Sequence, residues 1–395
     1  MSNTTVHAPY LIIGGGMTGA AAAIGIREID PSGKIIMISA ETSPPYDRPP
    51  LSKKLWDGKR TVGQIVAPLP GDVELHLCRH VTALNPDTRE VTDDLGEVYT
   101  YDRLLLATGG TPRRLPFGGD AVNYYRTIAD YRALREDVAN GASFVVIGGG
   151  FIGSELAASL RKQGSHVVMV FPDDGIANRV FPPDMADYLN NYYREHGVQV
   201  LNRENVVGIE ADDGWAVVVT DIGTRLTTDR VVAGIGIIPS VDLAREAGLA
   251  VGNGIIVDEF LRTARPEIYA AGDVAYYPDP ALGIRRRVEH ADAARAMGRV
   301  AGRNMAGAAE SYRYLPLFYS ELFELGYEAV GLCDTRLEMV QDWQERFRKG
   351  VIYYMKDGRV AGVLLMDIWD RTDEGRALIE SGETYTAEQL IGRIR

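Results

Sequence analysis

Hydrophobic residues along the first 250 positions fall into short continuous runs, and two of these runs lead into glycine-rich turns. One segment, from Tyr10, reads YLIIGGGMTGAAAAIGIRE, and the other, from Phe144, reads FVVIGGGFIGSELAASLRK. Each combines an apolar run, a G-x-G-x-x-G turn and a stretch of small residues, and a second apolar run follows at 34–39 and at 166–171. The pattern predicts strand, turn, helix and strand twice over, which is typical of a doubly wound α/β fold.

The glycines of the two turns have separable physical roles. The first of each set permits the tight turn, the second lets the backbone approach a pyrophosphate, and the third lets the helix pack closely on the sheet. The two sets are Gly14, Gly16 and Gly19, then Gly148, Gly150 and Gly153. One such motif is weak evidence, but two in full context indicate two dinucleotides. FAD together with a nicotinamide cofactor is the simplest interpretation.

Two further strand ends carry candidate nucleotide contacts. The stretch YDRLLLATGGTPRRLP (101–116) ends an apolar run on Ala107, Thr108 and Gly109, and RPEIYAAGDVA (265–275) ends another on Gly272 and Asp273. An aspartate after a glycine at such a strand end can accept hydrogen bonds from sugar hydroxyls. Taken alone, it indicates no more than a turn.

The order of these segments predicts three domains. A discontinuous FAD-binding domain covers 1–123 and 251–313, and a NADH-binding domain covering 124–250 is inserted into it. From 314 to 395 the pattern changes to alternating strands with a hairpin at Asp357–Gly358 and a helical tail. The predicted fold class is α/β, with two Rossmann-like domains and a C-terminal α+β domain that holds an antiparallel sheet.

Composition narrows the possible partners and locations. The 395 residues are 46% apolar with a net charge of −12, which is typical of a globular protein and argues against nucleic acid as a partner. No apolar run approaches the ~18 residues of a membrane span. The sequence enters its first strand almost at once, which leaves no room for a signal peptide and favours a cytoplasmic location.

The cysteines and histidines of the sequence argue against a redox-active dithiol and a metal site. Cys78 and Cys333 lie far apart and form no C-x-x-C motif, and Cys78 is expected to be a small buried residue in a strand. The six histidines are scattered, with no metal-ligand spacing. The sequence therefore predicts no metal site and no redox-active dithiol.

The segments together resemble a known family. They are PPYDRPPLSKKLW (44–56), ATGGTPR (107–113), GGGFIGSELA (148–157), AAGDVA (270–275), RRRVEHADAARAMGRVAGRNM (285–305), LGYEAVG (325–331) and GVIYYMKDGRVAGVLLMDIWDR (350–371). Over nearly the whole chain they are similar to FAD-dependent NAD(P)H oxidoreductases of the ferredoxin or rubredoxin reductase branch, which includes apoptosis-inducing factor. The import segment and long C-terminal insertion of the mitochondrial form are missing, so the resemblance implies a compact prokaryotic relative and carries over no role in cell death.

The proline-rich stretch gives Glu155 a possible partner. An acidic residue in the first turn of a helix would complement the helix dipole, and a stiff proline-rich stretch can simply be a surface loop. The resemblance instead implies that Arg48 meets the FAD phosphates and that Lys53 lies beside the flavin ring, paired with Glu155. Because a buried ion pair is weak evidence for stability, its retention would indicate a role at the flavin.

Three more residues take roles from the resemblance. It implies that His290 begins a helix against the flavin ring, that Glu289 lies near the nicotinamide and that Tyr319 covers the flavin. A partly buried structural histidine and a plain core aromatic are the alternatives. Hydride transfer itself needs alignment more than an acid or base.

The remaining predictions concern the two nucleotides. Asp173, 20 residues after Gly153, is placed to bind the adenosine ribose and repel a 2′-phosphate, which favours NADH over NADPH although Arg179 is near. Ile152 and Gly236 complete the predicted NADH contacts. Glu41 is the candidate for the FAD ribose, with Ala40 where relatives often have an acid.

The sequence therefore predicts an FAD-dependent NADH oxidoreductase that passes electrons to a small redox protein such as a ferredoxin, or to a quinone. The alternative is a redox-sensing protein like apoptosis-inducing factor, in which a long-lived NADH–flavin charge-transfer complex controls dimerisation or partner binding. NADH oxidases and peroxidases are disfavoured because the RPPLSKK region lacks a cysteine. Formation of a homodimer and the role of Arg285–Arg287 stay open.

Overall fold

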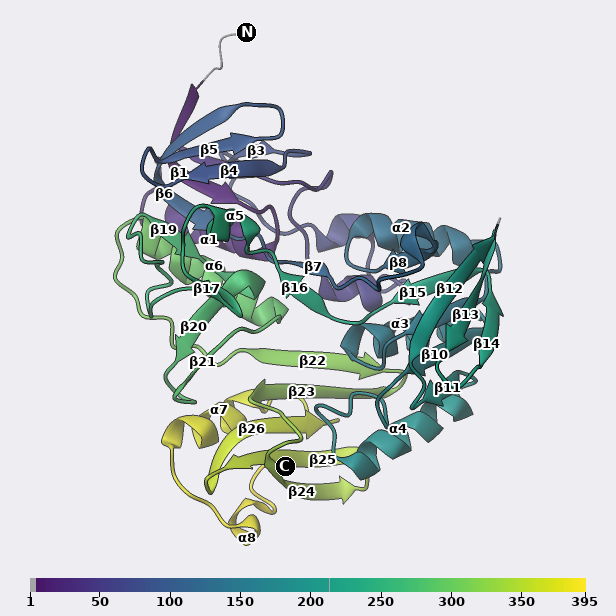
Figure 1. The fold of residues 1–395 in the computed structure, drawn as a ribbon. Coiled ribbons are helices and arrows are strands. Elements are labelled where there is room, and N and C mark those ends of the chain that lie inside the picture. Colours follow the sequence, from purple (N-terminus) through teal and green to yellow (C-terminus); the bar gives the residue numbers. More distant parts are fainter. Residues whose placement is uncertain (1–4, 213) are drawn as a thin grey trace. The chain divides into compact units, whose positions relative to one another are not determined.

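A computed structural model describes residues 5–212 and 214–395 of the chain (Figure 1). Its contacts divide the chain into two compact units, and each unit is assembled from three separate segments. Unit 1 comprises 1–48, 63–111 and 238–316, and unit 2 comprises 49–62, 112–237 and 317–395. The inserted order is thus visible in the chain path, while the three domain boundaries drawn from the sequence stay a prediction.

Unit 1 is built on a mainly parallel sheet in the order β3-β2-β1-β6-β5-β4, with β19 also paired to β6. Its outer pairs, β4 with β5 and β5 with β6, are antiparallel. The other elements are a four-stranded sheet β17-β18-β20-β21 and three helices, of which α1 and α6 pack together. The strands are β1 (Thr5–Ile13), β2 (Ile35–Ile38), β3 (Glu74–His76), β4 (Val81–Asn85), β5 (Glu90–Asp93), β6 (Val98–Leu106), β17 (Val251–Gly252), β18 (Gly254–Ile256), β19 (Ile268–Ala270), β20 (Ala275–Asp279) and β21 (Ile284–Arg286); the helices are α1 (Met17–Arg27), α5 (Asp242–Glu246) and α6 (Ala291–Met305).

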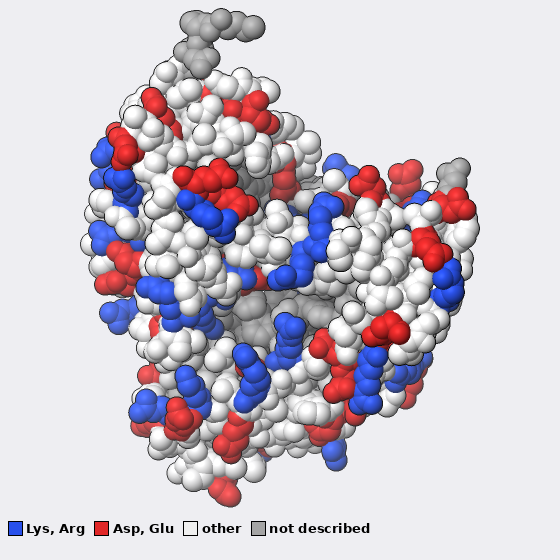
Figure 2. Space-filling view, viewed as in Figure 1, with Lys and Arg blue, Asp and Glu red and all other residues white. Residues whose placement is uncertain are grey.

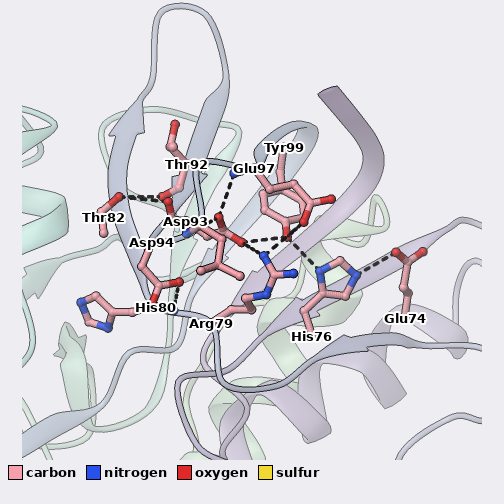
Figure 3. Close-up of polar contacts among 11 residues, drawn as sticks. Glu74, His76, Arg79, His80, Thr82, Thr92, Asp93, Asp94, Glu97 and Tyr99 are labelled. Carbon is pink, nitrogen blue, oxygen red and sulfur yellow. Dashed lines mark hydrogen bonds and ion pairs between the residues drawn. The ribbon is translucent and has the colours of Figure 1, made fainter. Parts of the chain in front are cut away.

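A buried polar network anchors the turn between β5 and β6 (Figure 3). The carboxylate of Asp93, with a fully buried side chain, pairs with Arg79 Nη1 at 2.7 Å and accepts hydrogen bonds from the backbone N–H groups of Leu95 and Glu97. The hydroxyl of Tyr99 also donates to Asp93, at 3.2 Å. Burial alone would raise the pKa of Asp93, but the hydrogen bonds from Glu97, Arg79 and Leu95 outweigh it and lower the pKa.

Unit 2 contains a second parallel sheet, in the order β11-β10-β9-β15-β8, with α2, α3 and α4 and a three-stranded antiparallel sheet β12-β13-β14. Apolar side chains of the two sheets, such as Val170 and Val218, share one core. The bounds are β8 (Val122–Tyr124), α2 (Ile128–Ala139), β9 (Phe144–Ile147), α3 (Phe151–Lys162), β10 (Val167–Phe171), α4 (Pro183–Glu195), β11 (Gln199–Asn202), β12 (Val206–Asp212), β13 (Trp215–Thr220), β14 (Arg225–Thr228) and β15 (Arg230–Ala233). Short strands β7 (Gly110–Pro112) and β16 (Ile237–Pro239) span the positions where the chain passes between units.

The C-terminal part of unit 2 is a five-stranded antiparallel sheet in the order β22-β23-β26-β25-β24. Asp357 and Gly358 both have positive φ, 51° and 74°, and form the predicted turn between β25 and β26. The bounds are β22 (Leu317–Leu322), β23 (Leu325–Gly331), β24 (Glu338–Glu345), β25 (Lys349–Lys356), β26 (Arg359–Met366), α7 (Thr372–Ser381) and α8 (Ala387–Leu390). The predicted α/β class and the antiparallel C-terminal sheet are confirmed.

One local prediction is wrong. Cys78 is exposed and lies outside any strand, with a φ of 56°, because the chain turns there directly after β3. Elsewhere on the surface, acidic and basic side chains are interspersed on the face that Figure 2 shows. Within the described ranges, no helix is both long and apolar enough to cross a membrane.

Candidate functional site

The first glycine turn lies in unit 1, between β1 and α1. Gly14 has a φ of 118°, and a Cβ there would lie 2.1 Å from the carbonyl oxygen of Ala107, so a side chain would displace the backbone. Around the Cβ position of Gly16, by contrast, the space is open to 4 Å. Gly16 is also the N-cap of α1, where no side chain caps the first-turn N–H groups and no acidic residue follows. This cradle suits a phosphate, as FAD requires.

Two residues predicted to contact FAD pair with each other. Glu41 accepts hydrogen bonds from the Tyr46 hydroxyl at 2.6 Å and from Arg48 Nη2 at 2.5 Å. Burial alone would lower the pKa of Arg48, but the nearby Tyr46 and Glu41 outweigh burial, so the pKa of Arg48 is raised. The proline-rich stretch thus holds the charged guanidinium of Arg48 against Glu41, the predicted ribose ligand.

The other predicted FAD contacts lie at strand ends of unit 1. Ala107 directly follows β6, Thr108 donates to the Ser240 carbonyl at 2.8 Å, and Gly109 has a φ of 64°. Gly272 and Asp273 follow β19, the strand that pairs with β6. All of them therefore gather at the carboxyl end of the sheet that carries the first glycine turn, where nucleotides bind in this class of fold.

The helix predicted to begin near His290 is α6, with His290 as its N-cap. Burial, followed by the charge of Arg286, lowers the pKa of His290 to about 4, so the imidazole is neutral at pH 7. The neighbouring Glu289 pairs with Arg287 at 2.7 Å. The helix thus presents a neutral imidazole, rather than an additional positive charge, at its N-terminus.

The second glycine turn lies in unit 2, between β9 and α3. Gly148 has a φ of 113°, with the Gly234 carbonyl oxygen 2.5 Å from its Cβ position, and the space around Gly150 is open. Ile152, in the first turn of α3, is 39% exposed, and Gly236 has a φ of 93°. An uncapped helix N-terminus beside an exposed apolar side chain fits the phosphates and an apolar part of a nicotinamide nucleotide.

Asp173 lies two residues beyond the end of β10 and is half-buried. Its carbonyl oxygen accepts a hydrogen bond from the Arg203 N–H at 3.1 Å. The last residue of the strand is Phe171, whose ring stands 2.8 Å from the Cβ position of Gly149. Arg179, six residues further along the chain than Asp173, is exposed.

Lys53 and Glu155 meet inside unit 2. Lys53 Nζ donates to Glu155 Oε2 at 2.6 Å, and the two side chains are only 7% and 3% exposed. Glu155 is the fifth residue of α3, beyond its first turn, so the helix dipole does not explain it. The stretch 49–62 and α3 are far apart in sequence, and the ion pair joins them.

Aromatic side chains hold the Lys53 segment in place. The Leu51 carbonyl accepts hydrogen bonds from Trp56 Nε1 at 2.7 Å and from the Tyr125 hydroxyl. The Leu55 carbonyl accepts from Tyr131 at 3.0 Å, and the Tyr131 ring packs edge-on against Trp56. The segment is therefore part of the folded core of unit 2, which fixes the position of the lysine.

Tyr319, on β22, lies beside this pair. Lys53 Nζ is 5.4 Å from the centroid of its ring, which is within the range of a cation–π contact. The next residue, Ser320, is buried, and its hydroxyl donates to Glu155 Oε1 at 2.6 Å. Thus β22 contributes both an aromatic ring and a hydrogen bond to the same site.

Sequence reasoning missed the serines. Ser52 Oγ donates to Glu155 Oε2 at 2.5 Å, and Ser320 satisfies the other carboxylate oxygen. Ser159 in turn donates to the carbonyl oxygen of Ser52 at 2.7 Å. Ser52 and Ser320 lie next to the predicted Lys53 and Tyr319, but they are separated from Glu155 by more than 100 residues, and no spacing in the sequence connects them.

Comparison with known proteins places these features in context. The model of the pyridine nucleotide-disulphide oxidoreductase family matches residues 8–298, and that of the C-terminal part of apoptosis-inducing factor, mitochondrion-associated, matches 301–345. A Sphingobium ferredoxin reductase subunit of 5,5′-dehydrodivanillate O-demethylase is 36% identical over 97% of this chain and 96% of its own. Mitochondrial apoptosis-inducing factor 1 of Dictyostelium discoideum is 34% identical over 94% of this chain and 78% of its own. The crystal structure of a covalent putidaredoxin reductase–putidaredoxin complex superposes with a TM-score of 0.90 at 30% identity, over 96% of this chain and 95% of that chain.

Proposed function

Because this chain belongs to the pyridine nucleotide-disulphide oxidoreductase family, in its group of FAD-dependent ferredoxin reductases, we propose that it passes electrons from NADH to a small iron–sulfur protein of the ferredoxin class. It is an FAD-dependent NADH oxidoreductase. FAD, when bound, accepts the two electrons of a hydride and returns them one at a time. A ferredoxin takes a single electron, so each NADH reduces two ferredoxins.

The observation that carries this proposal is the Lys53–Glu155 pair with its serine donors. Three side chains, from two segments of unit 2 that are distant from α3 in sequence, converge on the carboxylate of Glu155, which is 3% exposed. An ion pair so deeply buried adds little to the stability of the fold. Its effect is instead to hold the ammonium of Lys53 and the carboxylate of Glu155 in fixed positions. In our proposal Lys53 and Glu155 serve the flavin, and Tyr319 covers the ring.

The nucleotides are assigned to the two glycine turns. The uncapped N-terminus of α1 would hold the FAD pyrophosphate, with Arg48, Glu41 and Asp273 as phosphate and sugar ligands. The uncapped N-terminus of α3 would hold NADH, with Ile152 and Asp173 as further contacts. Because His290 is neutral, it would add no charge where the N-terminus of α6 meets the flavin. Glu289 would lie near the nicotinamide.

A second candidate function is favoured by one observation, the match of residues 301–345 to the C-terminal part of apoptosis-inducing factor. In that case a stable NADH–flavin complex would be the output of the protein, through dimerisation or partner binding. Relatives named as ferredoxin reductases match the chain over almost its full length, which supports electron transfer more strongly.

An anaerobic titration with NADH separates the two functions. We expect the flavin to bleach, and then to be reoxidised promptly on addition of a [2Fe–2S] ferredoxin. A broad long-wavelength band that persists for minutes in air, without reduction of ferredoxin, would overturn the proposal in favour of the redox sensor. Reoxidation by a quinone but not by ferredoxin would reassign the acceptor. Light scattering before and after NADH addition tests whether the chain forms a homodimer, and cell fractionation tests the predicted cytoplasmic location.

A further inference from the structure

A small cavity opens beside the Lys53–Glu155 pair in unit 2. It encloses about 30 Å³, and its wall includes Ser52, Lys53, Ala158 and two carboxylates, those of Asp57 and Glu321. A water molecule needs roughly 10–15 Å³ and two to four polar partners. The cavity therefore has room for about two waters, and its lining offers them hydroxyl, ammonium and carboxylate groups.

Hydrogen bonds connect this cavity to the buried carboxylate. Ser52 and Lys53 line the cavity, and each donates to the same oxygen of Glu155, at 2.5 and 2.6 Å. The two donors are also in contact, with Lys53 Nζ 3.5 Å from Ser52 Oγ. Glu155 is thus buried from solvent but separated from the cavity by only one polar group.

The other side of the cavity reaches the surface. Asp57 is exposed and pairs with Lys59 at 2.9 Å. Partial burial raises the pKa of Asp57, but the hydrogen bonds from Lys59 outweigh it and leave the pKa below its usual value. Glu321 is half-buried, and the exposed Lys162 completes the charged wall. Two carboxylates and one ammonium group therefore line the cavity on its partly exposed side.

The stoichiometry of the proposed function requires an exit for a proton. A hydride delivers two electrons together with one proton, and ferredoxins accept electrons only. The balanced reaction is NADH plus two oxidised ferredoxins to NAD⁺, two reduced ferredoxins and one proton. Each turnover must therefore return one proton from a buried site to solvent.

We propose that this proton leaves through Glu155, Lys53 and the cavity. Glu155 would accept the proton that the hydride brings to the bound flavin as the electrons depart, and the ammonium of Lys53 would give one of its own protons to a cavity water. The proton on Glu155 then returns to Lys53, directly or through the Ser52 hydroxyl, so that the ion pair is restored. The cavity water passes its proton to Asp57 or Glu321 and so to bulk solvent. This inference rests on the proposed function.

Two variants test the route in the FAD-loaded protein. Ala158→Leu fills the cavity from α3, where Ala158 is 3% exposed, without changing a charge. Asp57→Asn/Glu321→Gln removes the two carboxylates at the outer end of the cavity while keeping the size of each side chain. Asp187→Asn/Glu195→Gln is the matched control, since it changes the same charge at exposed positions of α4, also in unit 2.

The two half-reactions are measured separately by anaerobic stopped flow. Reduction by NADH is followed by flavin absorbance, and reoxidation by ferricyanide, which takes electrons and no protons, is followed with a pH-indicator dye in weakly buffered solution. We expect Ala158→Leu to reduce at the wild-type rate but to release its proton about a hundredfold more slowly, the lower end of what positioned proton-transfer groups supply. The double variant should show a smaller slowing that grows in deuterium oxide, and the control should show none. A crystal structure should hold ordered waters in the wild-type cavity and none in Ala158→Leu.

The outcomes distinguish this route from the function on which it rests. Wild-type proton release in a folded Ala158→Leu protein overturns the route, as does equal behaviour of the Asp57/Glu321 and control variants. If Ala158→Leu does not fold, the Asp57/Glu321 comparison decides alone. Failure of NADH to reduce the wild-type flavin would instead overturn the proposed function.

Discussion

Two buried carboxylates, Asp93 in unit 1 and Glu155 in unit 2, are each paired with a cation, at 2.7 and 2.6 Å. Their side chains are 0% and 3% exposed, so burial alone does not separate them. The two carboxylates differ in their other hydrogen-bond donors. Asp93 accepts from two backbone N–H groups of its own turn, within four residues. Glu155 accepts from the hydroxyls of Ser52 and Ser320, 103 and 165 residues away.

The difference indicates what each carboxylate is for. A carboxylate that caps the N–H groups of its own turn stabilises that turn, whatever else it touches. A carboxylate held only by side chains from distant segments satisfies no local backbone, and its desolvation is offset by groups placed for it. We therefore expect changes at Asp93 to alter stability, and changes around Glu155 to alter the chemistry of the flavin.

The largest effect should follow from Lys53→Met. It leaves the buried charge of Glu155 without a cation, which typically costs about 3–5 kcal/mol of stability. Lys53→Met/Glu155→Gln removes both charges, and its amide oxygen can accept from one serine while its NH2 group donates to the hydroxyl oxygen of the other, so it should recover most of that stability. Both variants should reduce with NADH about a hundredfold more slowly, the cost of misaligned reacting groups. Denaturant unfolding and anaerobic stopped flow measure the two quantities; a wild-type flavin spectrum and reduction rate would end the functional claim for Lys53.

Asp93→Ala should lower stability without slowing the reduction of the flavin. It removes the buried partner of Arg79, which keeps only Glu97 at 3.3 Å, and the acceptor for two N–H groups, so the free energy of unfolding should fall by about 3 kcal/mol. Reduction by NADH in the folded variant should be unchanged. Asp94→Ala, whose carboxylate accepts from the His80 N–H, is the neighbouring control and should cost about 1 kcal/mol. A slowed reduction in folded Asp93→Ala would show that stability and chemistry are not separated as proposed.

The same comparison shows what the sequence can predict. The glycine turns, the apolar strands and the Asp357–Gly358 turn follow from local rules, since backbone sterics and burial act over a few residues. The approach of Lys53 to Glu155 was anticipated through family resemblance, because no local rule relates positions 102 residues apart. Ser320 and the cavity at Ala158 follow from tertiary packing alone. Cys78 was placed wrongly because a turn interrupts the apolar pattern there.

Acid should weaken the Asp93 turn. The pKa of Asp93 is lowered in the folded protein, so the folded state binds fewer protons than the unfolded state once pH approaches ~4. Its contribution is therefore complete above that pH and is lost as pH falls through the folded pKa. The stability difference between wild type and Asp93→Asn should be constant from pH 7 to about 5 and shrink by about 1 kcal/mol toward pH 3. A difference that grows on acidification would contradict the assigned sign.

The smallest effect is expected from Ser320→Ala, which removes one donor from Glu155 Oε1 and leaves Lys53 and Ser52 on the other oxygen. A hydrogen bond to a charged group contributes about 1.5–3 kcal/mol. If about half of that free energy serves to align the Lys53–Glu155 pair for hydride transfer, reduction by NADH should slow by about tenfold or less.

Two variants serve as controls for Ser320→Ala. Ser320→Thr keeps the hydroxyl on a residue suited to β22 and should recover the rate, whereas Ser381→Ala on α7 should have no effect. Stopped flow measures the rate of reduction, and the flavin spectrum is the second readout. A serine with a purely structural role would lower the free energy of unfolding without changing the rate or the spectrum. Equal rates in Ser320→Ala and wild type would reduce the serine to a packing role and leave Lys53 as the group that fixes Glu155.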